Sequence, residues 1–171
     1  MKYSRFEELP VWRAAIELAV QVYAMTANAS FKGQASLRDQ IERASVSISN
    51  NIVEGFERGT TQELLTFLYI SRGSAGEVRS MLCLLERLPA FHDLKPEISN
   101  LKSRSESIAR QLRAWSDSLQ NSDIKGQRYL TDKTRRADQM ARERKEFINE
   151  FRQIQAENIA RTRKAGKAGK E

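Results

Sequence analysis

The stretch that decides the fold is LRDQIERASVSISNNIVEGFERG, residues 37–59. Its apolar residues recur every three or four positions, a spacing that places them on one face of an α-helix. They are Leu37, Ile41, Ala44, Ile48 and Ile52. Ser36 is suited to cap the start, and Gly55 or Gly59 can end the helix because glycine adopts the left-handed conformation without strain. The stretch predicts an amphipathic helix over about residues 36–54.

The same periodicity recurs before and after this stretch. It predicts one helix over about residues 8–28 and another over about residues 94–120. Between them, Thr60 followed by Glu63 is a capping-box pattern that starts a helix, and Pro89 stops it. Four amphipathic helices joined by short loops predict an all-α, antiparallel up-down four-helix bundle.

Charge divides the chain into unequal parts. The 171 residues carry a net charge of +7. Residues 1–120 hold 15 Lys and Arg against 14 Asp and Glu, whereas residues 121–171 hold 14 against 8. We therefore predict a bundle at 1–120, a linker at 121–128 and a basic, partly helical C-terminal extension at 129–171. Such basicity favours an acidic partner, usually nucleic acid, and a solubilising tail is the alternative.

The cellular compartment is indicated by what the sequence lacks. Cys83 is the single cysteine, so no intramolecular disulfide can form and a reducing compartment is indicated. The start, MKYSRFEELPVW, has no apolar run typical of a signal peptide. No stretch is long and apolar enough to span a bilayer. The sequence predicts a cytoplasmic protein with no membrane partner.

Residues that could support catalysis are sparse. His92 is the one histidine, so a single chain cannot build a histidine-based metal site. No HExxH, Walker A or Rossmann glycine pattern is present. Cys83 lies between leucines and is interpreted as a small core residue rather than a nucleophile. We expect no enzymatic activity, no metal and no cofactor.

Two clusters of small residues have a less obvious purpose. One comprises the serines and asparagines of 45–51, and the other is Gly73-Ser74-Ala75-Gly76. Glycine inside an exposed helix costs up to about 1 kcal/mol, so two of them indicate tight helix packing or a subunit seam. The alternative is a local helix break, because Ser74 with Glu77 can cap a new start.

The extension carries a narrow apolar stripe. From Tyr129 to about Arg163 it contains neither glycine nor proline. Its apolar residues step by seven, four and three, which is too thin a stripe to fold alone. We predict that they dock on the bundle, a sister subunit or a partner protein. They are Met140, Phe147, Phe151 and Ile154.

Three segments, 6–18, 37–59 and 67–78, resemble the bacterial four helix bundle protein family. This family includes proteins encoded in intervening sequences of large-subunit ribosomal RNA genes and relatives of the accessory variability determinant of diversity-generating retroelements. The resemblance covers about residues 6–119, so it does not reach the extension. The matching residues are Phe6, Leu9, Val11, Trp12, Gln40, Arg43, Ala44, Ser47, Ile48, Asn51, Ile52, Glu54, Gly55, Arg58, Gly73, Ser74 and Glu77.

The resemblance implies a ring-shaped homo-oligomer, with a pentamer favoured, and no catalytic activity. In the retroelement branch it implies binding to a reverse transcriptase and its template RNA through basic surfaces, whereas the ribosomal branch has no settled function. Residues one helical turn apart can present one polar face to a neighbouring subunit. The residues predicted for packing or assembly are Asn51, Glu54, Gly55, Gly73, Ser74 and Glu77.

The leading functional hypothesis is an RNA-binding accessory protein that partners a reverse transcriptase. Its mechanism is electrostatic, because each Lys or Arg near a phosphate releases counterions. The alternatives are a protein–protein scaffold that docks through the apolar stripe, and an rRNA intervening-sequence protein without a known function. The predicted nucleic-acid contacts are Arg58, Arg135, Arg136, Arg142, Arg144, Arg161, Arg163, Lys164, Lys167 and Lys170.

Overall fold

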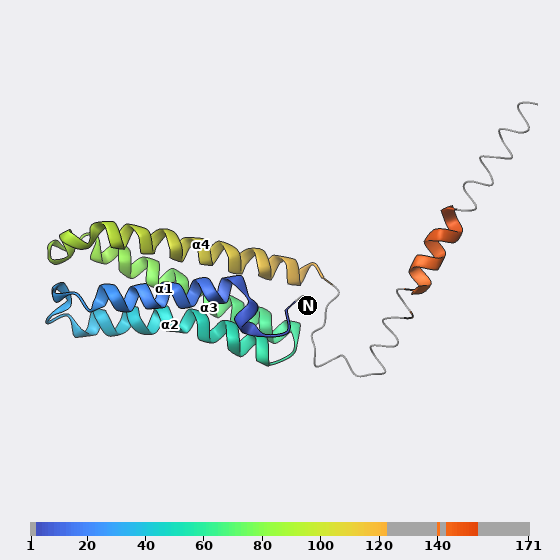
Figure 1. Cartoon of the computed structure of the whole chain (residues 1–171), viewed down its shortest axis with the longest axis horizontal. Coiled ribbons are helices and arrows are strands. Elements are labelled where there is room, and N and C mark those ends of the chain that lie inside the picture. The colour runs from blue at the N-terminus through green and yellow to red at the C-terminus, as the bar shows by residue number, and fades with distance from the viewer. Residues whose placement is uncertain (1–2, 123–139, 141–142, 154–171) are drawn as a thin grey trace, which may run out of the picture. The chain divides into compact units, whose positions relative to one another are not determined.

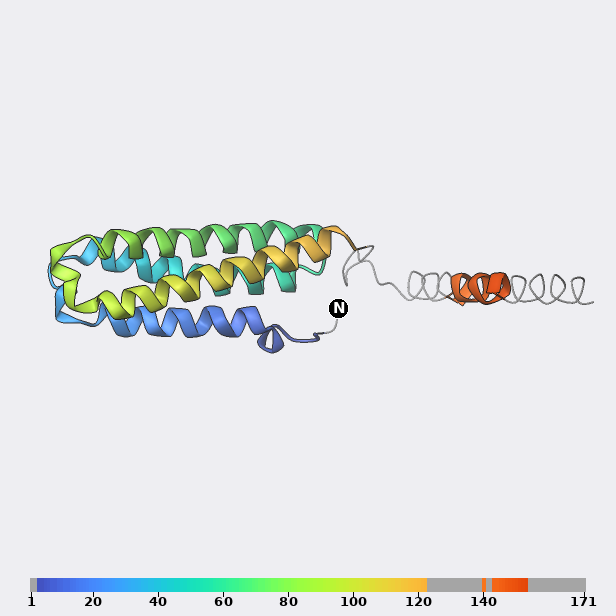
Figure 2. The ribbon, with the colours of Figure 1, turned by 90° about the horizontal axis from the view of Figure 1, so that it is seen from above.

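Four antiparallel helices form the first part of the chain (Figures 1 and 2). The computed structural model describes residues 3–122, 140 and 143–153, and the chain divides into two units, Met1–Arg128 and Tyr129–Glu171. Every regular element in these described residues is helical, which confirms the predicted all-α fold. The bundle helices are α1 (Pro10–Thr26), α2 (Ala35–Glu57), α3 (Thr61–Leu85) and α4 (Lys95–Gln120). Short 3-10 turns are η1 (Phe6–Glu8), η2 (Ala29–Phe31) and η3 (Pro89–Leu94).

Some helix ends lie where the sequence predicts them, and others do not. The Thr60 Oγ1 accepts the Glu63 N–H at 3.2 Å, so the predicted capping box is confirmed. Gly59 has φ 77 just after α2, whereas Gly55 lies inside that helix. The predicted cap at Ser36 is wrong: the N-cap is Gln34, and its side chain makes no capping hydrogen bond.

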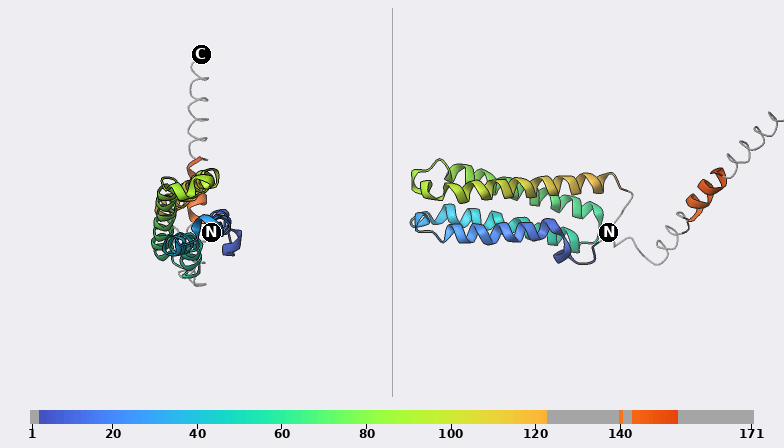
Figure 3. Two further views of the ribbon diagram at one scale, coloured as in Figure 1. Left: turned by 90° about the vertical axis from the view of Figure 1, so that its left-hand side faces the viewer. Right: turned by 45° about the horizontal axis from the view of Figure 1, so that its top comes forward.

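The core follows the apolar stripe of each helix. The left view of Figure 3 looks along the bundle and shows the helices arranged around a common axis. α3 packs extensively on both α2 and α4, whereas α1 makes fewer contacts with α4. The largest fully buried side chains are Leu18, Ile41, Ile48, Ile52, Leu64, Leu68, Leu82, Leu85, Phe91, Ile98, Ile108 and Leu112. Burial of these side chains is the main favourable term in folding.

An aromatic pair closes one end of the bundle. Phe31, from the connection between α1 and α2, packs on Phe91 of η3 with ring centroids 4.7 Å apart. Both rings are buried. The Asn28 Oδ1 accepts the Ser30 N–H at 2.9 Å and caps the short turn that positions Phe31. The two connections therefore meet at the same end of the bundle (Figure 1).

Candidate functional site

A ladder of small polar side chains joins α2 to α3. The Asn51 Nδ2 donates to the Ser47 carbonyl at 2.7 Å and to the Ser47 Oγ at 2.9 Å. The Ser47 and Ser74 hydroxyls lie 3.0 Å apart across the two helices. One turn away, the Ser71 hydroxyl donates to the Ile48 carbonyl at 2.8 Å. Asn51 and Ser74, predicted for packing or assembly, thus make their hydrogen bonds inside one chain.

The glycines of the matching segments occupy two different environments. A Cβ at Gly55 would lie 2.7 Å from the Phe67 Cβ, so only glycine permits this approach of α2 to α3. A Cβ at Gly73 or Gly76 would meet no heavy atom within 4 Å in the described part of the chain. α3 continues unbroken across both, so the alternative of a local helix break is wrong. Gly73 and Gly76 are exposed, and so is Glu77.

Arg58, a predicted nucleic-acid contact, is held by its own chain. Its guanidinium lies 2.6 Å from the Glu54 carboxylate and 3.7 Å from that of Glu63. It also sits 4.7 Å from the centroid of the Phe67 ring. The hydrogen bond to Glu54 raises the pKa of the Arg58 guanidinium. Two carboxylates balance this charge, and the arrangement fastens the turn between α2 and α3.

The extension is described in part. Residues 143–153 form a helix whose side chains are all exposed, Arg144 among them. The Phe147 and Phe151 rings stack with centroids 6.3 Å apart, and 67% of Phe147 is exposed. Met140 is exposed as well. The remaining predicted contacts lie outside the described residues: Arg135, Arg136, Arg142, Ile154, Arg161, Arg163, Lys164, Lys167 and Lys170.

Two arginines of α3 and one in the turn that follows it form a basic row, a grouping that the sequence analysis did not make. Arg72, Arg79 and Arg87 are exposed and lie seven and eight residues apart. Within residues 3–122 none of them forms an ion pair, unlike Arg38 with Asp39 or Arg110 with Glu106. The spacing of seven is the signal that places Arg72 and Arg79 on one side of the helix. Only the structure shows that the three arginines form no ion pair within residues 3–122, although the hydrogen bond to Lys102 and the charge of Arg87 lower the pKa of the adjacent Glu86 carboxyl.

One ion pair connects α3 to α4. The Lys102 Nζ lies 2.6 Å from the Glu86 carboxylate. This hydrogen bond lowers the pKa of the Glu86 carboxyl and raises the pKa of the Lys102 ammonium. Cys83 is half buried on the same side of α3 and interacts with the Lys102 ammonium. The pair stabilises the register of α3 and α4.

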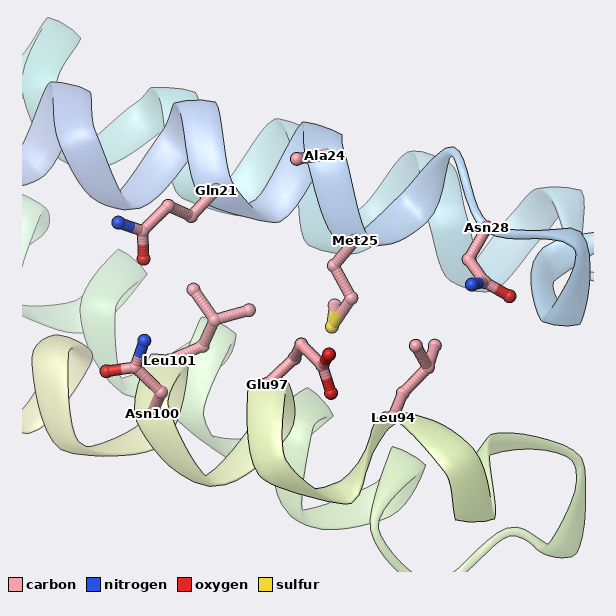
Figure 4. A pocket seen from close by; sticks show the side chains of 8 residues that line it. All are labelled: Gln21, Ala24, Met25, Asn28, Leu94, Glu97, Asn100 and Leu101. Atoms are coloured by element: carbon pink, nitrogen blue, oxygen red, sulfur yellow. The ribbon is translucent and has the colours of Figure 1, made fainter.

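A cavity of about 350 Å³ opens between α1 and α4 (Figure 4). Met25, Leu94 and Leu101 give it an apolar base, and Gln21 and Asn100 approach one another from opposite helices. The other lining residues are Ala24, Asn28 and Glu97. The lining holds a single carboxylate, that of Glu97, so it offers no pair of groups for general acid–base catalysis.

The described part of the chain offers neither a metal site nor a membrane-spanning helix. Within residues 3–122, 140 and 143–153, no three His, Cys, Asp or Glu side chains are grouped closely enough to hold a metal ion. None of the helices in those ranges is sufficiently long and apolar to cross a membrane. The candidate sites of the described chain are therefore surfaces: the basic row of α3, the exposed side of α1 and the helix 143–153.

These features define an all-helical protein of the antiparallel four-helix bundle class. The family model described as 23S rRNA-intervening sequence protein matches residues 7–114, and the chain belongs to this family. A solved structure of a protein of unknown function from the S23 ribosomal protein family of Bacteroides thetaiotaomicron VPI-5482 is similar, with TM-score 0.55 and 21% identity over 62% of this chain and 97% of that one. That likeness shows the fold. None of the curated proteins compared with the chain matches it.

Proposed function

We propose that this protein is a non-enzymatic, homo-oligomeric, cytoplasmic RNA-binding accessory protein. The observation that carries the proposal is the division of charge. Residues 121–171 hold 14 Lys and Arg against 8 Asp and Glu, whereas residues 1–120 are nearly balanced at 15 against 14. An excess of positive charge in one segment attracts the phosphates of nucleic acid, and binding releases counterions. In a ring, the basic extensions of several subunits belong to one assembly, so its total positive charge is several times that of one chain.

The proposed partner enzyme is a reverse transcriptase, and the proposed assembly is a ring of five subunits. Both come from the resemblance to the retroelement branch of the family. An accessory ring that binds both the enzyme and its template RNA raises the effective concentration of one near the other. A reverse transcriptase gene beside the gene for this chain supports this branch, and a surrounding rRNA gene supports the intervening-sequence branch.

The subunit contact we propose lies on α1. Ile16, Val20 and Tyr23 are 38%, 58% and 49% exposed, and their spacing of four and three places them in one stripe. Val20→Asp introduces a charge into this stripe and is expected to lower the oligomer mass in solution. Gly73→Gln on α3 is the matched control. If Gly73→Gln dissociates the oligomer and Val20→Asp does not, the subunit seam runs through Gly73 instead.

The test of RNA binding compares two variants of the full chain across a salt series. One variant neutralises five basic residues of the extension with glutamine, and the control exchanges Lys and Arg at the same positions. Neutralisation should weaken binding and reduce the slope of log affinity against log salt by about 3.5, at roughly 0.7 for each single-strand phosphate contact. Equal binding by both variants contradicts the proposal. The positions are Arg161, Arg163, Lys164, Lys167 and Lys170.

A second candidate function is a protein–protein scaffold. The observation that favours it is the exposed, stacked pair Phe147 and Phe151 in helix 143–153. Exposed aromatic side chains one turn apart are suited to insertion into a groove of a partner. Phe147→Ala with Phe151→Ala should abolish copurification with a neighbouring reverse transcriptase and leave RNA affinity unchanged. Unchanged copurification excludes the pair as an anchor.

A further inference from the structure

We propose that the bundle itself binds the phosphate backbone of single-stranded RNA on the side where α3 lies against α4. This inference rests on the proposed RNA-binding function and adds a contact that lies outside the basic extension. The α3/α4 face is defined by Arg72, Gly73, Gly76 and Arg79 of α3, by Arg87 in the turn that follows α3, and by Arg113 of α4. Each of these residues is exposed.

The charges of the face form a line along α3. Arg72 and Arg79 are seven residues apart, about 10 Å along the axis of α3, and Arg87 lies in the turn after the helix ends at Leu85. None of the three forms an ion pair within residues 3–122. An arginine whose charge is uncompensated gains more from a phosphate than one that must first leave a carboxylate.

Hydrogen bonds between α3 and α4 fix where Arg113 lies. The Gln120 Nε2 donates to the Tyr69 hydroxyl at 2.6 Å, and farther along the Lys102 Nζ donates to the Glu86 carboxylate at 2.6 Å. Because the helices are antiparallel, seven residues back from Gln120 is level with seven residues on from Tyr69. Arg113 is therefore level with Gly76, between Arg72 and Arg79. Its contact with Asp117 is long, at 3.7 Å.

The two glycines leave the helix backbone open at the centre of this face. A Cβ at Gly73 or Gly76 meets no heavy atom of the described residues within 4 Å, so no contact in that part of the chain requires glycine there. Each exposed glycine lowers helix stability by about 1 kcal/mol relative to alanine. Close approach of an extended strand to the backbone gives these residues a purpose, because the flanking arginines can then contact phosphates from both sides.

An aromatic ring lies beside the same opening. The Arg72 guanidinium sits 5.6 Å from the centroid of the Tyr69 ring. Tyr69 is 40% exposed, and its hydroxyl accepts the hydrogen bond from Gln120 that holds the ring in place. Exposed aromatic and guanidinium planes stack on unpaired bases. The combination of an arginine row with one ring favours a single strand over a duplex.

The carboxylates near the face leave an excess of positive charge. Glu86 is paired with Lys102, and Glu77 flanks Gly73 on the side toward α2. Asp117 lies 3.7 Å from Arg113, so the excess of positive charge on the exposed side comes from Arg72, Arg79 and Arg87. Phosphate is the ligand chemistry that complements such a surface.

The first test neutralises the row in the full-length protein. Arg72→Gln, Arg79→Gln and Arg87→Gln are combined, and the control combines Arg13→Gln, Arg38→Gln and Arg43→Gln on α1 and α2. Both triple variants change net charge equally, and arginine and glutamine have similar helix propensities. With polyuridylate as the probe, the α3 variant should reduce the salt slope by about 2 and the control by much less. Equal slopes for the two variants overturn the inference.

A single substitution at Gly76 tests whether RNA contacts the exposed backbone of α3, and it removes no arginine. Gly76→Glu places a carboxylate and added bulk among the arginines, while Gly76→Ala adds only a methyl group in open space. The glutamate variant should lose at least several-fold in polyuridylate affinity, and the alanine variant, which adds a methyl group but no charge, should lose less. Unchanged affinity of the glutamate variant overturns the inference. The proposed RNA-binding function survives if neutralising the extension still weakens binding, and both proposals fail if the unmodified protein binds no RNA.

Discussion

Helix α3 carries small residues on two of its sides, and the two sides use them differently. On the side facing α2, Ser74 bonds across the interface, and Gly55 of α2 approaches Phe67 too closely for any larger residue. On the exposed side, a Cβ at Gly73 or Gly76 would meet no heavy atom within 4 Å among the residues that the structure describes. Similar residue types thus serve packing on one side and leave free backbone on the other. Residue type alone does not separate these roles, whereas contact geometry does.

The strongest test of the packed side is Gly55→Ala. Alanine favours a helix by up to about 1 kcal/mol over glycine, but here its Cβ would lie 2.7 Å from the Phe67 Cβ and 3.2 Å from the Leu64 Cα. Neither atom is the end of a flexible side chain, so α2 and α3 must separate. We expect a net loss of about 1–3 kcal/mol in the free energy of unfolding, measured by urea denaturation. A more stable variant would show that the two helices can move apart freely.

Ser74→Ala probes the polar contact on the same side. The substitution removes the 3.0 Å contact with the Ser47 hydroxyl. Loss of one such hydrogen bond should lower the free energy of unfolding by about 1 kcal/mol. Ser80→Ala, at an exposed position of α3, is the control and should change stability by less than about 0.5 kcal/mol. Equal effects would contradict the distinction between the two sides.

Substitutions at the exposed glycines of α3 should raise the free energy of unfolding, whereas those on the side facing α2 should lower it. Gly73→Ala and Gly76→Ala meet open space, so each should raise the free energy of unfolding by about 0.5–1 kcal/mol through helix propensity. Thermal or urea unfolding of the single variants measures this gain. Destabilisation by either variant would indicate that the exposed glycines are already in contact with a neighbouring subunit.

The smallest expected effect concerns pH. The Glu86 pKa is lowered from 4.5 by its hydrogen bond with Lys102. A lowered pKa in the folded state contributes stability that is present above pH 4.5 and is lost as the pH falls through the folded value. Glu86→Gln should therefore weaken the dependence of the free energy of unfolding on pH below pH 4.5. At neutral pH the variant should be slightly less stable than the unmodified protein. Identical acid profiles for both proteins would show that the pair contributes nothing measurable.

Periodicity was sufficient to predict the bundle, because apolar spacing and capping patterns are local in sequence. The capping box at Thr60 is such a pattern, and the structure contains it. The expected cap at Ser36 failed, because α2 begins earlier, at Ala35. Gly55 was a possible helix end in the sequence, and its contact with Phe67 on another helix is not visible there.

The candidate surfaces were harder to predict from the sequence than the fold was. Arg72 and Arg79 look like ordinary surface charges until it is known that neither forms an ion pair within residues 3–122. Arg58 shows the reverse case, because the sequence does not reveal that Glu54 and Glu63 already hold it. The contact of Arg58 with Glu54 is an i,i+4 pair that the sequence spacing permits, whereas the contact with Glu63 depends on how the turn brings α3 against the end of α2.

The aromatic pair Phe31 and Phe91 determines which end of the bundle opens more readily by local unfolding. It fastens the connection of α1 and α2 to the connection that precedes α4, while α1 and α4 share fewer contacts than the other neighbouring helices. A pair of helices fastened at one end frays from the other. Amide hydrogens near Pro10 of α1 and near Gln120 of α4 should therefore exchange with solvent sooner than those beside the two rings.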